Sequence, residues 1–254
     1  MKKIICKTLG CMVGAAVLIG SGVARGEDAA PVATASTDLS FLSGYVWRGQ
    51  VINDEAVFQP SFTMGKNGFA INTWGNANLT DVAGTSQELT ELDLTLSYSK
   101  TVGNVALSGG YIEYTFPNTT FSGTREVFAS AGLPNLLIVP TLSVNYDFDA
   151  ADGAYANFGL AYSHGLSDKV TLGLFASIGA ATSDYNSFYF GVNDTALNDV
   201  NAGATLGIAV TKALTITPAV QYTTLVDNKI KDGAATLYKD TEAVVGSIKA
   251  TYVF

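Results

Sequence analysis

The feature that most constrains the fold of this chain is a period-two alternation of apolar and polar side chains. It is clearest in ELDLTLSYSK at 91–100, where Leu92, Leu94, Leu96 and Tyr98 share one face of an extended strand. The intervening positions are acidic, Ser or Thr and share the other face. No stretch of the mature sequence has a convincing helical periodicity. We therefore expect an all-β fold whose strands have one apolar and one polar face.

About twelve segments follow this pattern, each near the ~9–11 residues with which a tilted strand crosses a membrane's hydrocarbon. A soluble β-sandwich would alternate as well, so strand length alone does not separate the two folds. The segments lie near 37–48, 54–64, 68–78, 88–100, 103–114, 122–133, 139–147, 154–164, 168–180, 200–211, 213–224 and 242–254.

The connections between these segments separate the two folds better. Those after even-numbered segments are mostly short, as at 66–68 and 101–103, whereas those after odd-numbered segments are often longer, as at 79–87, 181–199 and 225–241. Bacterial outer-membrane barrels have this asymmetry, with tight periplasmic turns and longer external loops. An open sheet edge in lipid would leave backbone groups unpaired. We therefore predict a transmembrane antiparallel up-and-down β-barrel of about twelve strands.

Aromatic residues near the strand ends predict two membrane girdles. Tyr and Trp favour the membrane interface because their rings are apolar while their OH and NH groups bind water. Aromatic side chains are also common in soluble β-protein cores, so this pattern supports the membrane fold without establishing it. The predicted girdle residues are Tyr45, Trp47, Tyr98, Tyr146, Tyr162, Tyr222, Tyr252 and Phe254.

The last segment, SIKATYVF, alternates up to a terminal Phe254. Such an ending is typical of outer-membrane proteins that are presented to the barrel-assembly machinery. The expected partners are therefore that machinery, outer-membrane lipid and lipopolysaccharide, and small polar solutes. The expected location is the outer membrane of a Gram-negative cell.

The N-terminal residues predict an export signal. Three lysines precede an apolar run at 9–23, and Ala24–Gly26 supplies small residues before an expected cleavage at Glu27. The run is shorter than the roughly 20 residues of a membrane-spanning helix. The predicted domains are a cleaved signal peptide at 1–26, a short extension at 27–36 and a single barrel at 37–254.

Composition excludes several classes of site. Both cysteines lie within the signal, so the mature chain has neither disulfides nor thiolates. All 22 acidic residues lie at or after Glu27, while four of the 14 basic residues leave with the signal, so that 10 basic residues remain and the mature net charge is −12. Nucleic acid is therefore not an expected partner. No His/Cys metal cluster and no Gly-rich phosphate loop with Lys is present in the sequence, so no metal and no cofactor is predicted.

Arg48 needs a polar environment beside aromatic neighbours. In SGYVWRGQVINDEAVF at 43–58, alternation with Tyr45 and Trp47 facing lipid turns Arg48 toward the lumen, near the external end of the first strand. Its partner is left open among Glu91, Asp93, Glu126 and Asp147 on other strands, and Asp54 and Glu55 across the first turn.

Two roles remain open for the inward charges. Ion pairs can simply brace the wall, because buried charges need partners whatever the function, or they can form a charged constriction that sorts solutes. Lys249 is expected to face Asp38 lower in the barrel, where the first and last strands meet. The predicted pore-lining residues are Asp38, Arg48, Glu91, Asp93, Glu126, Asp147 and Lys249.

Residues 42–78, LSGYVWRGQVINDEAVFQPSFTMGKNGFAINTWGNAN, carry a recognisable pattern. It consists of an aromatic-x-x-Arg-Gly strand end, an Ala-Val strand, then Gly-Phe and a Trp-Gly strand, matched by Tyr45, Arg48, Gly49, Ala56, Val57, Gly68, Phe69, Trp74 and Gly75. This region resembles the start of the TorF-type porin family of proteobacterial outer-membrane β-barrels. The turn differs, since QVINDE stands where that family often has serines. The resemblance implies an outer-membrane barrel with channel function.

The leading functional hypothesis is a porin for passive diffusion of small polar solutes. Its predicted lining is small and polar, with residues such as Thr95, Ser97, Asn157 and Gln221. The acidic net charge and inward carboxylates predict a mild preference for cations.

Two alternatives belong to other classes. A lipid-modifying enzyme would need a nucleophile beside a base, but the sole histidine, His164, follows Ser163, and neighbours on a strand point oppositely, so no catalytic residues are predicted. The other alternative is a plugged structural or surface-binding barrel, because loops 181–199 and 225–241 are long enough to fold inward. DFDAADG at 147–153 resembles a calcium loop only loosely, since its spacing is off by one and the closing Glu is absent, so we interpret it as a solvated turn.

Overall fold

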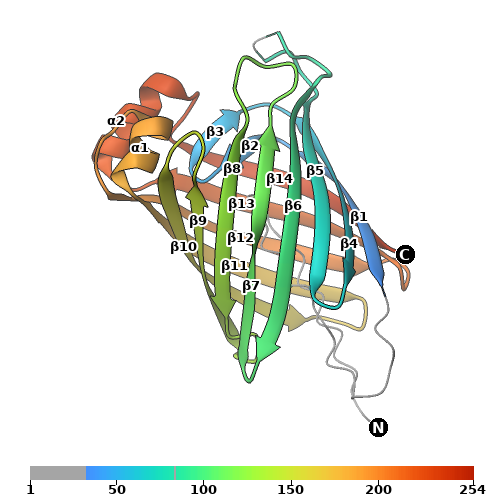
Figure 1. Cartoon of the computed structure of the whole chain (residues 1–254). Coiled ribbons are helices and arrows are strands. Elements are labelled where there is room, and N and C mark those ends of the chain that lie inside the picture. The colour runs from blue at the N-terminus through green and yellow to red at the C-terminus, as the bar shows by residue number, and fades with distance from the viewer. Residues whose placement is uncertain (1–32, 83) are drawn as a thin grey trace.

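The chain folds into a closed β-barrel. A computed structural model describes residues 33–82 and 84–254. Twelve antiparallel strands close in the order β1-β14-β13-β12-β11-β10-β9-β8-β7-β6-β5-β4, and a separate two-stranded hairpin, β2–β3, accompanies them (Figure 1). This confirms the predicted fold and strand number. The predicted signal peptide and most of the predicted extension lie outside the described residues, and the first strand begins at Thr34, before the predicted barrel start at 37.

The elements have the following bounds. They are β1 (Thr34–Leu42), β2 (Tyr45–Trp47), β3 (Gln50–Asn53), β4 (Val57–Lys66), β5 (Phe69–Asn78), β6 (Leu89–Val102), β7 (Val105–Thr115), β8 (Thr124–Gly132), β9 (Ile138–Asp147), β10 (Gly153–Gly165), β11 (Val170–Ala181), α1 (Ser183–Phe190), β12 (Ala196–Ala209), β13 (Leu214–Leu225), α2 (Asn228–Leu237) and β14 (Glu242–Val253).

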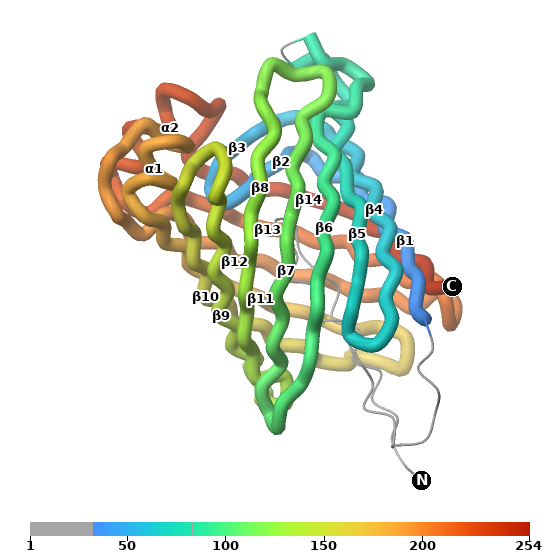
Figure 2. The backbone as a smooth tube through the Cα atoms, in the orientation of Figure 1, coloured from blue at the N-terminus to red at the C-terminus, as the bar shows by residue number. Residues whose placement is uncertain are grey.

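The barrel closes where its first strand lies between β4 and its last strand. Asp38 of β1 stands opposite Thr251 on β14 and opposite Ser61 on β4. The tube in Figure 2 shows β1, in blue, between β4 and the red end of the chain. Each barrel strand therefore has a hydrogen-bonded neighbour on both sides, which is the condition for a sheet to lie in lipid.

The two faces of the wall have opposite chemistry. Leu92, Leu94 and Leu96 are 45%, 37% and 46% exposed, so they lie on the outer face as predicted. Inward-facing polar side chains bond to each other across strands: Gln221 Nε2 donates to Asn201 Oδ1 at 3.0 Å. The alternation of the sequence thus becomes an apolar exterior and a polar interior.

The two ends of the barrel also differ. Tight turns join the strands at one end, such as Asn67-Gly68, whose φ angles of 55° and 85° suit a two-residue hairpin. The opposite end carries β2–β3, the two helices and the longer connections (Figure 1). Neither α1 nor α2 has the length and apolarity of a membrane-crossing helix, and the described residues contain no other helix.

The predicted first strand at 37–48 is wrong beyond Leu42. The barrel strand ends there, and the chain continues as a hairpin that reverses at Arg48-Gly49. Both turn residues have positive φ, 49° and 81°, as a type I′ turn requires. The second barrel strand consequently begins at Val57 instead of near 54.

The predicted membrane-girdle role of Tyr45 and Trp47 is also wrong. Their side chains are 4% and 9% exposed, in an apolar cluster with Leu42, Val57 and Ile112 of the barrel wall. The physical reason is that the hairpin folds into the end of the barrel, where the wall and Tyr189 of α1 bury these two rings. Alternation assigns residues to faces of a strand, but it does not say what those faces meet.

Candidate functional site

The tip of the β2–β3 hairpin lies across the barrel interior. A Cβ on Gly49 would come within 2.5 Å of Leu225 Cδ2 and 2.8 Å of Asp199 Cβ, on β13 and β12. The neighbouring Arg48 reaches Glu126 on β8 instead. One turn therefore contacts two separated parts of the wall, and glycine allows the close approach as well as the positive φ.

Arg48 and Glu126 form a buried, two-pronged ion pair. Nη1 and Nη2 of the guanidinium each donate to one carboxylate oxygen at 2.7 Å, and the two side chains are 5% and 0% exposed. Among the partners left open by the sequence, the structure selects Glu126. This parallel geometry is the strongest form of an arginine–carboxylate contact.

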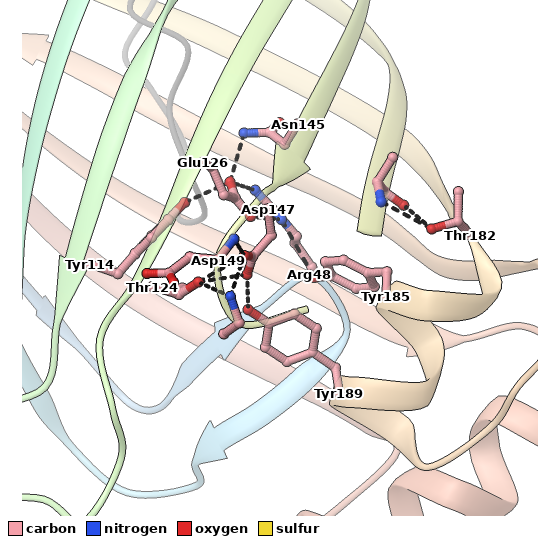
Figure 3. Close-up of polar contacts among 12 residues, drawn as sticks. Arg48, Tyr114, Thr124, Glu126, Asn145, Asp147, Asp149, Thr182, Tyr185 and Tyr189 are labelled. Atoms are coloured by element: carbon pink, nitrogen blue, oxygen red, sulfur yellow. Dashed lines mark hydrogen bonds and ion pairs between the residues drawn. The ribbon is translucent and has the colours of Figure 1, made fainter. Parts of the chain in front are cut away.

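Further donors complete the carboxylate's hydrogen bonding. The Tyr114 hydroxyl and the Asn145 amide both donate to Glu126 Oε2 at 3.0 Å, as Figure 3 shows. A buried charge is tolerated when its remaining lone pairs are satisfied in this way. The pair is thus an organised feature of the wall and hairpin together.

Aromatic rings enclose the guanidinium. Its Cζ lies 4.4 Å from the ring centre of Trp47, 4.8 Å from that of Tyr155 and 5.8 Å from that of Tyr185. Nη1 also lies 3.5 Å from the Tyr185 hydroxyl. Burial raises the pKa of that hydroxyl, so Tyr185 stays neutral beside the cation.

A second buried carboxylate lies next to this cluster and was missed from the sequence. Asp199 Oδ1 accepts a hydrogen bond from the Tyr155 hydroxyl at 2.9 Å, and its Oδ2 accepts one from Asn201 at 2.7 Å. The predicted strand at 200–211 began one residue too late to include it. Extending the alternation by that residue would have placed Asp199 inside.

Asp147 is inward and fully buried, but it holds a loop together. Its carboxylate accepts hydrogen bonds from Thr124 Oγ1 at 2.8 Å and from the backbone N–H groups of Asp149 and Ala150 at 3.0 Å. The interpretation of 147–153 as a solvated turn is therefore wrong at Asp147, and Ala151 and Gly153 are buried as well. No cluster of three potential metal ligands occurs in the part of the chain that the structure describes.

The other predicted pore-lining residues also face inward. Glu91 and Asp93 alternate with the outward leucines of β6, and Asp93 Oδ1 is buried without a hydrogen-bond partner. Asp38 accepts a hydrogen bond from the Thr251 hydroxyl, while Lys249 stands opposite Ser40. The Asp38–Lys249 pair, and the lining of an open pore by these residues, stay predictions.

The remaining predicted girdle residues lie on the outer face. Exposed rings near the short-turn end include Tyr98, Tyr252 and Phe254, and those near the long-loop end are Tyr146 and Tyr222. Their position at a membrane interface stays a prediction.

Tyr162 also lies on the outer face, and its contact with His164 shows which way the histidine ring points. Its ring is parallel to that of His164, with centroids 6.3 Å apart, so both rings project from the same face of β10. Ser163 lies between them and points to the other face. The two side chains of a Ser163–His164 dyad therefore lie on opposite faces of the wall.

Two short helices, which the sequence pattern did not predict, hold the hairpin from the loop side. Asp227 caps α2 by accepting hydrogen bonds from the N–H groups of Lys229 and Ile230 at 2.8 and 3.2 Å. The Tyr238 hydroxyl, just after α2, lies 2.6 Å from Gln50 Oε1 on the hairpin and 2.8 Å from the carbonyl oxygen of Tyr189 on α1. The hairpin, α1 and α2 thus form one packed unit at this end of the barrel.

An exposed ion pair ties the loop after α1 to α2. Lys229 Nζ donates to Asp194 Oδ2 at 2.6 Å, and this hydrogen bond lowers the pKa of the Asp194 carboxyl. Because both side chains are exposed, solvent screens the pair.

Comparisons with known proteins place the chain in context. A family model described as "Bacterial protein of unknown function (Gcw_chp)" matches residues 26–252. No curated protein matches the chain. The TorF-type name inferred from residues 42–78 stays a prediction.

Solved structures of similar fold are porins and channels. The KdgM porin matches with a TM-score of 0.53 and 12% identity over 88% of this chain and 99% of its own. An outer membrane channel from Pseudomonas putida F1 matches with a TM-score of 0.50 and 10% identity over 91% and 100%. At these identities the likeness establishes the barrel fold alone.

Proposed function

Because the chain belongs to the Gcw_chp family of bacterial proteins and folds as a closed twelve-stranded barrel, we propose that it is a porin-like channel of the outer membrane. The observation that carries this proposal is the wall itself, with leucines outside and hydrogen-bonded polar side chains inside. The porin and the outer membrane channel of similar fold support it. Small polar solutes are the class that such an interior would admit.

The hairpin is the proposed constriction of this channel. Its tip contacts β8 through Arg48 and the β12–β13 wall through Gly49. The hairpin therefore reduces the cross-section of the bore at that level. Longer loops of bacterial barrels face outward from the cell, which puts the constriction near the external mouth.

A mild preference for cations is part of the proposal. The charge of Arg48 is neutralised by Glu126, so this arginine does not oppose the excess of acidic over basic residues in the chain. Acidic walls raise the local concentration of cations in a bore. Reversal potentials across a salt gradient measure this preference, and a preference for anions would contradict it.

A plugged structural barrel is the second candidate. The specific observation in its favour is that the hairpin, α1 and α2 pack as one buried unit at one end. Such a unit fits a permanent seal as well as a constriction.

One pair of proteins separates the two candidates. Refolded wild type and a variant with residues 44–55 replaced by a short Gly-Ser turn are compared in planar bilayers, after a heat-modifiable gel shift has verified that both barrels are closed. A channel conducts as wild type and conducts more without the hairpin. A plugged barrel is silent as wild type and conducts only without the hairpin, and silence of both variants contradicts the porin proposal.

A further inference from the structure

The guanidinium of Arg48 sits in a cage that the rest of the molecule builds without it. Glu126 comes from β8, Tyr155 from β10 and Tyr185 from α1, and only Trp47 travels with Arg48 on the hairpin. In Figure 3 the arginine enters between Glu126 and the Tyr185 ring. The cage therefore belongs to the wall and the loop helix, while its occupant belongs to a separate element.

The cage has the chemistry of a guanidinium site. Two parallel contacts of 2.7 Å match the fork of a planar guanidinium, which an ammonium group cannot reproduce. Ring centres at 4.8 and 5.8 Å add the cation–π attraction that favours flat, weakly hydrated cations. Tyr114 and Asn145 fix the carboxylate from behind, each at 3.0 Å from Oε2, so Glu126 does not depend on Arg48 for its orientation.

The occupant is delivered by a turn with an uncommon backbone. Arg48 has a φ of 49°, a conformation that non-glycine residues rarely adopt. The turn holds it because the side chain reaches the cage while Gly49 seats against Leu225. Arg48 is in this sense a ligand tethered to the hairpin.

We propose that Glu126, Tyr155 and Tyr185 form a binding site for small solutes that carry a guanidinium group, and that Arg48 fills this site when none is bound. A solute and Arg48 cannot occupy the cage together, so a bound solute leaves the hairpin tip without its buried ion pair. The inference rests on the proposed function only in that the solute reaches the cage through the bore.

The test uses a variant that leaves the cage without its tethered ligand. Arg48→Ala is made together with Trp74→Phe, so that Trp47 is the remaining tryptophan of the protein's two and its fluorescence reports the hairpin. Methylguanidinium and methylammonium are titrated at equal ionic strength, and binding is measured by calorimetry as well as fluorescence. We expect saturable binding of methylguanidinium with a Kd of about 0.1–10 mM, as suits so few heavy atoms. Methylammonium should bind at least about tenfold more weakly, because it lacks the fork.

A matched variant tests the carboxylate. Adding Glu126→Gln removes the charge while keeping the shape, and it should weaken methylguanidinium binding by about tenfold or more, since charge-assisted hydrogen bonds are lost. Equal binding of both cations, no saturable binding, or indifference to Glu126→Gln would each overturn the proposal. Arg48→Met keeps the aliphatic part of the side chain without its charge or donors, and it serves in place of Arg48→Ala should that variant not close its barrel.

The outcome is separable from the channel proposal. A barrel that binds methylguanidinium but never conducts would contradict the proposed function and leave the cage standing. A barrel that conducts but binds neither cation would contradict the cage proposal and leave the channel proposal standing.

Discussion

At the residue scale, Arg48 joins the hairpin to the wall through a fully buried contact. Removing one partner of such a pair leaves the other charge buried and unpaired. An exposed pair loses little, because water replaces the partner. Arg125, which precedes Glu126 in the sequence, is the exposed arginine for comparison. It contacts Glu113 at 3.2 Å on the outer face and is 48% exposed.

We predict that Arg48→Ala destabilises the folded barrel by about 3–5 kcal/mol, because the Glu126 carboxylate is left without its cation. Arg125→Ala should cost much less, because solvent screens the exposed pair. Urea unfolding in detergent micelles measures both. Equal losses in the two variants would show that the buried pair contributes no more than the surface one.

Gly49 offers a second prediction at this scale. Gly49→Ala should lower the free energy of unfolding by about 1–3 kcal/mol through overpacking, because the added Cβ would lie 2.5 Å from Leu225 Cδ2. Gly84 is the matched control, since it has a φ of 82° against 81° at Gly49, while a Cβ at Gly84 would meet no described atom within 4 Å. Both substitutions carry the same backbone penalty, so their difference in unfolding free energy isolates the contact. A difference near zero would mean that the tip does not seat there.

At the element scale, the hairpin depends on α2 as well as on the wall. The Tyr238 hydroxyl contacts Gln50 Oε1 and the Tyr189 carbonyl, which links hairpin, α1 and α2 at one point. Burial raises the pKa of this hydroxyl, so it remains a donor over the ordinary pH range.

Tyr238→Phe should raise the fraction of time that the hairpin spends away from its packed position by about fivefold. This factor corresponds to the loss of a hydrogen bond worth about 1 kcal/mol. Single-channel recordings would show this as longer or more frequent high-conductance states. Tyr222→Phe is the control, because its hydroxyl bonds Glu242 at 2.7 Å on the outer face, away from the hairpin. Unchanged recordings for Tyr238→Phe would show that the contact of Tyr238 with the hairpin does not affect conductance.

The elements themselves were predicted with uneven success. Strands β5 to β14 lie within a few residues of the predicted segments, because each is a complete run of alternating residues bounded by turn residues. The hairpin was not predicted, because Tyr45 and Trp47 continue the alternation of β1 without a visible break. Arg48-Gly49 was the available signal, although Asn-Gly or Asp-Gly is the usual type I′ pair.

At the scale of the whole molecule, the outer face defines the solvent in which the barrel resides. Leu96 lies near the middle of β6 and is 46% exposed, with the neighbouring outward positions also apolar. A charge at that depth would have to enter hydrocarbon if the proposed membrane location is right.

We predict that Leu96→Arg lowers the stability of the barrel in lipid vesicles by about 2–4 kcal/mol. Phe121→Arg, at a loop residue that is 73% exposed, should have no measurable effect. Folding yield into vesicles, followed by the heat-modifiable gel shift, distinguishes the two. Equal insertion of both variants would argue against a lipid-facing wall.

Local pattern was enough to specify the wall of this protein. Period-two alternation assigns each side chain of a strand to one face, and the backbone's need for partners closes the sheet, so strand number, closure and the outward leucines follow from the order of the residues. Which carboxylate Arg48 meets, and that residues 45–53 form a hairpin inside the end of the barrel, became visible only in the folded structure. Those choices depend on the space inside the closed barrel and on side chains 78 positions apart, which no local pattern encodes.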